Sequence, residues 1–468
     1  MTSNLAAPGR ARTPRRALVA VLAAFTMAAT CVASNTASSV ASTATASKAT
    51  TGTKQVNAKP PSKQSRDDVT ARPTVEGVPT LPGAYRFASA PDFLNQDVAD
   101  VSGMSGYRGG PNGTNSSYED SLAYTLGQIA QTGAEDLFVA GDLVEGSWGL
   151  DKTGSGVFGP AETNAQRKAA ARRAAEVYYT SWRARVRAAG MEPYPAVGDH
   201  EMGDNPWTSR GRTDDYGTWL DWKRRNQTLF KDLFGEFALN YGPDPVVRRT
   251  SYVSRPTSGP SQKTAYASLV DPTTLLVTID VFHTTPDGSD VVAKVDDAQL
   301  AWLESVLANA QRAGIPWVIV QGHTPIVVPV RTRFSSALKY QGGTNSALWR
   351  LMDRYNVDFY FSGEVHDHTV AVANDIIQMS HGALFYRGEF SFVRGQATNS
   401  TMSLETHLFE ASDMAYGNLL WSTEGGNGPE FITYDDPSRV VGTLVVERGA
   451  NGRNTITRRT GISLPFYG

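Results

Sequence analysis

The heptapeptide Pro195-Ala196-Val197-Gly198-Asp199-His200-Glu201 decides the fold. Its apolar first half predicts the end of a buried strand, and the strand runs directly into Gly-Asp-His-Glu. This arrangement places a carboxylate, an imidazole and a second carboxylate where a sheet ends. A polar tetrapeptide after a strand is also typical of an ordinary turn. The interpretation therefore depends on whether other strand ends provide matching groups.

The composition limits the number of domains and the kinds of binding partner. The chain has 468 residues and 40% hydrophobic content, enough for one large domain or two ordinary ones. A formal charge of −2 argues against a protein that binds nucleic acid through a basic surface. The seven histidines and the single cysteine are few enough to follow one by one.

Residues 1–34 have the pattern of a signal peptide. A basic region ends at Arg15-Arg16, an apolar run covers 17–29, and small residues follow. The run is shorter than the ~20 apolar residues of a membrane-spanning helix, so we expect no membrane span in the mature protein. Secretion to the extracellular side is predicted, and Thr13-Pro14-Arg15-Arg16 is compatible with the twin-arginine route. The cysteine, Cys31, lies in this segment, so cleavage after it leaves no disulfide or thiolate site.

Two further segments follow. Residues 35–78 are rich in Ser, Thr, Ala and Lys and predict a disordered linker, because they bury too little apolar surface to offset the entropy of ordering. Residues 79–468 predict one α/β domain. We expect helices at 118–132, at 163–189 and from 296, a helical insertion at 216–237, and short β segments after about 370. Strands are expected at 85–90, 136–140, 275–279, 317–320, 357–361 and 440–446.

Five of the predicted strands end in groups that can ligate metal. Ligands gather at the carboxyl ends of strands in open α/β sheets. Carboxylate, amide and imidazole groups that meet there suit a pair of divalent ions. Four of the seven histidines lie in these corners. The groups in question are Asp92 and Asn95, Asp142 and Glu145, Asp199 to Glu201, His323, and Glu364, His366 and His368.

In this order the corners resemble the calcineurin-like metallophosphoesterase superfamily. Its pattern is Asp-x-His, Gly-Asp-x-x-Asp/Glu, Gly-Asn-His-Asp/Glu, Gly-His and Gly-His-x-His, and the match runs from Tyr85 to His368. The segment 297–303 also resembles a helix of the purple-acid-phosphatase branch. The resemblance implies a four-layer α/β/β/α sandwich of two mixed sheets with a dinuclear metal site at the strand ends.

The sequence departs from the family pattern at several positions. Leu94 stands where the family usually has its first histidine, and Asn95 is the nearest possible substitute. Asp199 replaces an Asn, and Glu364 replaces a His. These changes make the site richer in oxygen and favour harder ions such as Mn or Fe over Zn. Glu145 occupies the place of the iron-binding Tyr of purple acid phosphatases, so we expect no purple Fe(III) chromophore.

The resemblance also implies roles for individual residues. The cofactors would be two divalent or trivalent ions (Mn, Fe or Zn) bridged by Asp142. Asp92 and His366, with Asn95 as a further candidate, would complete the first ion, and Asp199, His323 and Glu364 the second. A hydroxide between the ions would attack phosphorus in line. His200 would assist the leaving group, and Glu201 or another carboxylate would orient it.

Several alternatives remain open at this level. His368 could replace His366 as the ligand, Glu145 could support the site from outside, His381 could line the pocket or only pack, and His283 could approach the substrate. The predicted function is a secreted hydrolase of small phosphorylated substrates, monoesters or diesters. The loops at 146–159 and 216–237 would determine specificity. A nucleotidase, a cyclic-nucleotide phosphodiesterase, or a non-catalytic cell-surface binding module are the alternatives, and the oligomeric state stays open.

Overall fold

The strand predicted nearest the N-terminus lies inside the first large sheet, which is mixed. β1 (Tyr85–Ser89) pairs in parallel with β2, and β2 in parallel with β3. On its other side β1 is antiparallel to β13. The strand order is β17-β16-β14-β13-β1-β2-β3, and β15 pairs with β14. The bounds are β2 (Asp136–Val139), β3 (Glu192–Pro195), β13 (Glu389–Ala397), β14 (Thr401–Asp413), β15 (Ile432–Tyr434), β16 (Arg439–Arg448) and β17 (Asn454–Gly461).

The second large sheet is also mixed, with the order β18-β11-β12-β10-β9-β6-β5-β4. At its centre β6, β9 and β10 run parallel. A separate two-stranded ribbon pairs β7 with β8. The bounds are β4 (Val253–Ser254), β5 (Tyr266–Asp271), β6 (Thr274–Thr278), β7 (Phe282–Thr284), β8 (Val291–Ala293), β9 (Trp317–Gln321), β10 (Phe359–Ser362), β11 (Thr369–Ala373), β12 (Ile376–Ser380) and β18 (Phe466–Tyr467).

The two sheets face each other across a buried interior. The Phe87 ring of β1 lies 6.4 Å from the Phe361 ring of β10. The Gln321 side chain donates to the Tyr194 carbonyl oxygen at 2.8 Å, so hydrogen bonds also join the sheets. The sheets are therefore the two inner layers of the fold.

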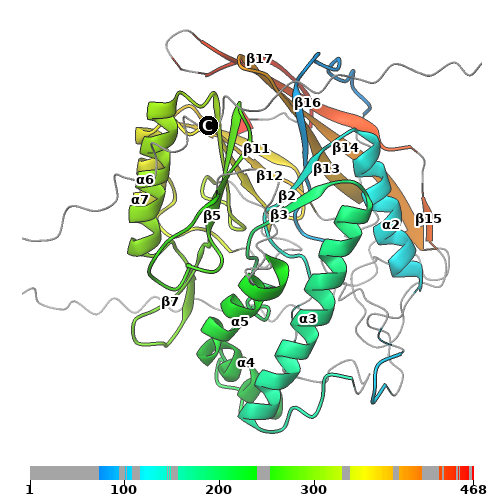
Figure 1. Cartoon of the computed structure of the whole chain (residues 1–468), viewed down its shortest axis with the longest axis vertical. Helices are drawn as coiled ribbons and strands as arrows, with labels where there is room; N and C mark the ends of the chain where they lie inside the picture. The colour runs from blue at the N-terminus through cyan, green and yellow to red at the C-terminus, as the bar shows by residue number, and fades with distance from the viewer. Residues whose placement is uncertain are drawn as a thin grey trace, which may run out of the picture. The chain divides into compact units, whose positions relative to one another are not determined.

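Helices form the two outer layers (Figure 1). α2 (Ser116–Gln131) and α3 (Asn164–Ala188) lie on the side of the first sheet, and α6 (Asp297–Ala313) and α7 (Ala347–Arg354) on the side of the second. In α6, the buried side chains recur at the three-to-four-residue spacing of one helix face: Leu303, Val306, Leu307 and Ala310. This arrangement confirms the predicted four-layer α/β/β/α sandwich of two mixed sheets.

The computed structural model describes most of the chain after residue 72. Ala71–Gly468 forms one compact unit. The predicted signal peptide and the linker up to residue 72 lie outside the described residues, as do Asn95, Glu145 and most of the 146–159 loop. Among the helices described, none is long and apolar enough to cross a membrane. The described residues are 73–93, 101, 103–107, 116–144, 146, 148, 157–239, 253–328, 338–382, 389–413, 432–434, 437–449, 452, 454–462 and 466–467.

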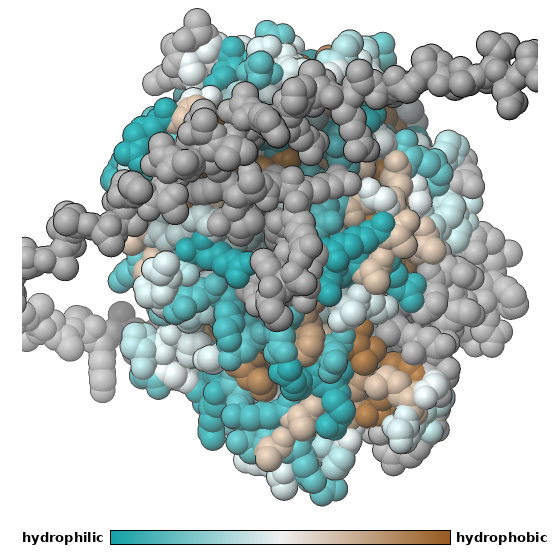
Figure 2. Space-filling model, in the orientation of Figure 1, coloured by the Kyte–Doolittle hydropathy of each residue, from teal (hydrophilic) through white to brown (hydrophobic). Residues whose placement is uncertain are grey.

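The predicted helical insertion consists of α4 (Asp215–Arg225), α5 (Gln227–Leu233) and the π-helical turn Phe234–Ala238. Its large aromatic side chains are buried, so they serve packing, as the sequence predicted: Trp219, Trp222, Phe230 and Phe234. Figure 2 shows mostly hydrophilic or intermediate described residues on one face of the molecule. Hydrophobic residues show through in the lower part, in the region of α3, α4 and α5.

The C-terminal third differs from the expected series of short β segments. β14 has 13 residues and β13 has 9, and together with β16 and β17 they complete the first sheet next to β1. Of these strands β13 pairs with β1, which lies about three hundred positions earlier, for example Tyr85 opposite Ala397. Local sequence patterns do not encode the pairing of strands so far apart along the chain. Polar residues also interrupt the apolar alternation within these strands, so the pattern predicts shorter strands than the structure has.

A segment before the predicted domain start already contacts this sheet. The Val75 N–H donates to the Val440 carbonyl oxygen at 2.9 Å, and the Val78 N–H donates to Glu405 at 2.5 Å. Glu405 also accepts from Arg394 at 2.5 Å and lies 3.5 Å from His407. Burial alone would raise the pKa of Glu405, but the nearby His407 ring and hydrogen bonds from Arg394 and the Val78 N–H lower it from 4.5 to about 2.

We predict that Glu405→Gln lowers the Tm by a few degrees at pH 7. A carboxylate whose pKa is lowered in the folded state adds stability above its unfolded pKa of 4.5, and this stability is lost as the pH falls toward 2. The difference in Tm between the two proteins should therefore shrink below pH 4.5 in thermal melts. The exposed Glu447→Gln on β16 is the control and should match the wild type throughout. A pH-independent difference would contradict the prediction.

Candidate metal centre

The predicted ligands come together where the strands of both sheets end. Asp92, Asp142 and Asp199 follow β1, β2 and β3, whose carboxyl ends share one edge because the strands are parallel. His323 follows β9, and Glu364 and His366 follow β10 in the second sheet. Backbone hydrogen bonds fix neighbouring corners to one another. The Asp92 N–H donates to the Gly141 carbonyl oxygen at 3.1 Å, and the Gly363 N–H to the His323 carbonyl oxygen at 3.0 Å.

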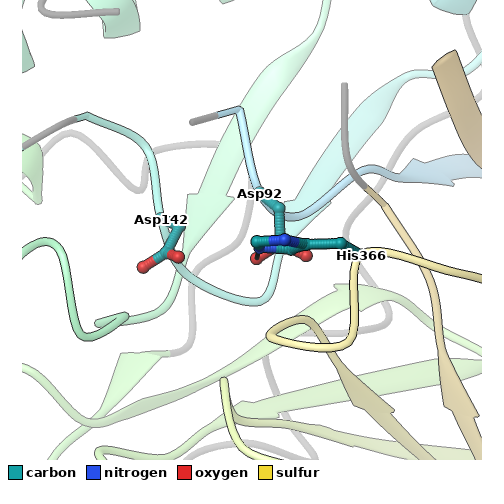
Figure 3. Close-up of side chains that lie close together, drawn as sticks. All are labelled: Asp92, Asp142 and His366. Atoms are coloured by element: carbon teal, nitrogen blue, oxygen red, sulfur yellow. Dashed lines mark ion pairs between the residues drawn. The ribbon is translucent and has the colours of Figure 1, made fainter. Parts of the chain in front are cut away.

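The side chains form two ligand groups that share Asp142. In each group one ligand atom per residue lies within 4.8 Å of the others; the groups are Asp92, Asp142 and His366, and Asp142, Asp199 and His323. Figure 3 shows the first group, with the His366 ring next to Asp92 and with Asp142 to one side, each on a separate loop. In the second group, His323 Nε2 lies 3.0 Å from Asp199 Oδ1 and 3.4 Å from Asp142 Oδ2. A shared carboxylate between two ligand sets is what a dinuclear site needs.

Glu364 converges on the second group. Its Oε2 lies 3.3 Å from His323 Nε2, and its Oε1 accepts from the Leu338 N–H at 3.1 Å. Its own N–H donates to Asp92 Oδ1 at 3.1 Å. The residue that stands in place of a family histidine therefore offers a carboxylate at the expected position.

The chemistry of the cluster fits cations. Asp92 and Asp142 are at most 1% exposed, and Asp92 Oδ2 is buried with no hydrogen-bond partner among the described residues. Burial raises the pKa of Asp92 to about 7 and that of Asp142 well above its ordinary value. Buried carboxylates remain ionised only when positive charge compensates them. Two metal ions would supply that charge.

His323 lies at the centre, where its ring supplies positive charge when protonated and a ligand atom when neutral. Burial alone would lower its pKa, but Asp142, Asp199 and Glu364 raise it well above the ordinary value. Its Nδ1 lies 2.8 Å from the Ala140 carbonyl oxygen. When Nδ1–H donates to that carbonyl, the Nε2 lone pair faces the carboxylates, which is the tautomer that a metal requires.

The backbone at four candidate ligands is left-handed. The φ angles are 56° at Asp92, 59° at Asp142, 68° at Glu364 and 52° at His366. Non-glycine residues rarely adopt this region, and each such residue costs about 1–2 kcal/mol. Strained backbone of this kind gathers at functional sites, and here it turns consecutive loops inward.

The glycines before Asp199 and Glu364 make room for the neighbouring corners. A Cβ on Gly198 would lie 2.0 Å from Asp142 Oδ1, and one on Gly363 would lie 2.9 Å from both carboxylate oxygens of Asp92. A larger residue at either position would displace a ligand. The Gly-Asp and Gly-Glu pairs of the sequence are therefore explained by close approach between loops.

Glu201 lies beneath these loops. The sequence suggested that it orients His200, but its carboxylate accepts hydrogen bonds from backbone N–H groups. The donors to Oε2 are Gly198 at 2.7 Å and Asp142 at 2.8 Å, and those to Oε1 are Leu143 at 2.7 Å and Val144 at 3.3 Å. Glu201 thus joins the corner after β2 to the corner after β3, and its contacts indicate a positioning residue.

His200 borders the same cluster and is more exposed than the ligands. Its side chain is 12% exposed, and its Nε2 lies 3.9 Å from Asp142 Oδ2. Its backbone N–H donates to Asp142 Oδ1 at 3.2 Å. An imidazole next to the bridging carboxylate, on the more open side, can reach a group that a bound substrate would release.

The structure places the remaining histidines elsewhere. His368 lies with its ring nitrogens 3.3 and 3.5 Å from Thr406 Oγ1, whereas His366 takes part in the first ligand group. His381 is buried, with Nε2 2.7 Å from Ser89 Oγ, and burial lowers its pKa to about 4. His381 thus packs beneath β1. His283 lies in β7, in the ribbon with β8.

One contact in the cluster had no signal in the sequence. The Asn205 side chain donates to Asp199 Oδ2. Asn205 lies in the loop after the third corner, outside every motif. Only the path of that loop brings it to the ligand.

Two mixed sheets between helices, with paired ligand groups at the strand ends that share a carboxylate, define a metallophosphoesterase fold and site. The Calcineurin-like phosphoesterase family model matches residues 115–368, more than half of the chain. The chain therefore belongs to the calcineurin-like phosphoesterase family, a family of phosphoric ester hydrolases.

Several known proteins are similar to this chain. An acid phosphatase of Aspergillus ficuum is 39% identical over 177 residues, which make up 31% of this chain and 28% of that protein. The chain thus spans less than a third of the length of this curated relative. The purple acid phosphatase PPD1 from yellow lupin (Lupinus luteus) seeds gives a TM-score of 0.39 at 16% identity, covering 72% of this chain and 53% of that one. PhoD gives a TM-score of 0.45 at 12% identity, covering 82% and 73%.

We predict that Glu201→Gln destabilises the fold by about 2–4 kcal/mol. The substitution removes the negative charge that accepts hydrogen bonds from four backbone N–H groups. It also turns a donor, the NH₂ group of the new side chain, toward some of those N–H groups. Urea unfolding followed by circular dichroism measures the loss. Glu192→Gln is the matched control. It alters a partly exposed pair with Arg187, and we expect a change within about 1 kcal/mol. Equal unfolding midpoints for Glu201→Gln and the wild type would show that Glu201 does not stabilise the fold by joining the two corners.

Proposed function

We propose that this chain is a metal-dependent phosphoric ester hydrolase that uses two cations. The observation that supports this proposal most directly is the pair of buried ligand groups that share Asp142. Family membership supports the reaction class. The alternative of a non-catalytic binding module gives no reason to keep His200 beside a complete ligand set.

We assign the following residues to the two cations. Asp92, Asp142 and His366 would hold the first ion, with Asn95 as a further candidate. Asp142, Asp199, His323 and Glu364 would hold the second. The ions would supply Lewis acidity, neutralising phosphoryl charge and lowering the pKa of water. Four carboxylates against two imidazoles make an oxygen-rich set, which favours Mn or Fe over Zn.

The chain's own residues have three further tasks. His200 lies outside the ligand groups that share Asp142, so its imidazole can donate a proton to the leaving oxygen. Glu201 keeps the two corners in register through their N–H groups. The buried setting of the carboxylates excludes bulk water and strengthens the interactions with a bound phosphoryl group.

We propose a phosphomonoester as the substrate and export as the destination. The similarity to an acid phosphatase of Aspergillus ficuum supports the first. The basic and apolar pattern of residues 1–34 supports the second.

We predict that His200→Ala lowers kcat by roughly 10²–10⁴ while both metals remain bound. Steady-state kinetics with p-nitrophenyl phosphate measure turnover, and elemental analysis of the same sample counts the metals. His407→Ala, in β14, serves as the control and should retain normal turnover. Unchanged turnover in His200→Ala, with or without loss of metal, would contradict the role assigned to His200.

Removal of metal provides a second test. Chelator-treated protein should lose activity, and Mn²⁺ or Fe²⁺ should restore more of it than Zn²⁺. The restored enzyme should cleave p-nitrophenyl phosphate faster than bis(p-nitrophenyl) phosphate. A protein that stays inactive on both esters after addition of Mn, Zn, Fe or Ca would overturn the enzyme proposal. Faster cleavage of the diester would overturn only the monoester assignment.

A further inference from the structure

The carboxylate of Asp199 is held at both oxygens. Oδ1 lies 3.0 Å from His323 Nε2, on the side of the second ligand group. Oδ2 accepts a hydrogen bond from the side-chain amide of Asn205. The Asp199 residue is only 2% exposed. Each oxygen thus has its own defined neighbour.

The loop that contains Asn205 folds back onto Asp199. The Met202 and Asp204 N–H groups both donate to the Asp199 carbonyl oxygen, at 3.1 and 2.8 Å. The Gly203 N–H donates to the His200 carbonyl oxygen at 3.0 Å. This tight turn fixes the start of Asn205 relative to the ligand that its side chain contacts.

The helical insertion holds the loop from the other side. The ammonium group of Lys223, in α4, donates to the Asp204 carbonyl oxygen. Gln227, in α5, donates to the Met202 carbonyl oxygen at 3.1 Å. Figure 1 shows α4 and α5 close together in the lower part of the fold, next to α3.

The contact between insertion and loop is close. A Cβ on Gly203 would lie 2.9 Å from both Lys223 Cδ and Phe230 Cζ. Lys223 is fully buried, and its ammonium group lies 4.2 Å from the centre of the Trp219 ring. A lysine buried in this way has a defined position, so the carbonyl that it contacts is also defined.

We infer that Asn205 is a positioning residue for the second metal ion, and that the α4–α5 insertion supports it. The amide occupies Oδ2 of Asp199, which would leave Oδ1, next to His323, as the oxygen available to an ion. A carboxylate without such a partner rotates about its Cβ–Cγ bond and exchanges its two oxygens. The inference rests on the proposed two-ion site and adds a residue that no ligand motif contains.

The test compares metal binding in three variants. Apo-protein is titrated with Mn²⁺ by calorimetry, and kcat/KM for p-nitrophenyl phosphate is measured on the same samples. In Asn205→Ala one of the two binding events should weaken about 10- to 100-fold while the other is unchanged, as is typical when the partner of a metal ligand is lost. Asn205→Asp keeps the shape but removes the donor, and it should lose at least as much.

The control is Asn226→Ala in the same insertion, where the amide donates to the Trp222 carbonyl oxygen at 2.8 Å. It should bind both ions like the wild type. If Asn205→Ala does not fold, the isosteric Asn205→Asp decides alone. Unchanged binding of both ions in the Asn205 variants overturns the inference and leaves the proposed function standing. A wild-type protein that binds no ions overturns both.

Discussion

The rest of the structure depends on the burial of three carboxylates, Asp92, Asp142 and Asp199, within reach of one another. Such a group of like charges would be expelled from a protein interior unless positive charge and hydrogen-bond donors met it there. His323 lies at its centre, and its ring nitrogens are within 4.0 Å of a carboxylate oxygen of each of the three. The left-handed backbone at the ligands, the glycines before them and the parallel strand ends all bring these groups to one place. The local strain is the cost of that convergence.

Two glutamates near the site show how position determines the use of a carboxylate. Glu364 offers one oxygen to the ligand group and takes a backbone N–H on the other. Glu201 presents both oxygens to backbone N–H groups. Its charge therefore organises the loops without adding to the ligand shell. Asn205 acts in the same supporting layer, one step further from the ions.

Much of this site could be predicted from the sequence, because each ligand directly follows a strong apolar run. The order of the corners then indicated the family, and the family implied the four layers. The role of Glu201 could not be predicted, since an acidic residue beside a histidine has the same sequence pattern whether it faces a ring or a backbone. Asn205 and the pairing of β13 with β1 depend on the path of loops and on distant strands, which local patterns do not encode.

The two halves of the first ligand group lie far apart along the chain. Glu364, which lies in the same corner as His366, is 272 positions from Asp92. Contacts of this separation form late, because the intervening chain must be ordered first. The candidate ligands from both sheets therefore come together only in a chain that has almost finished folding. Metal binding would then be one of the last steps of folding. Bound ions would link the two sheets at the edge where their strands end.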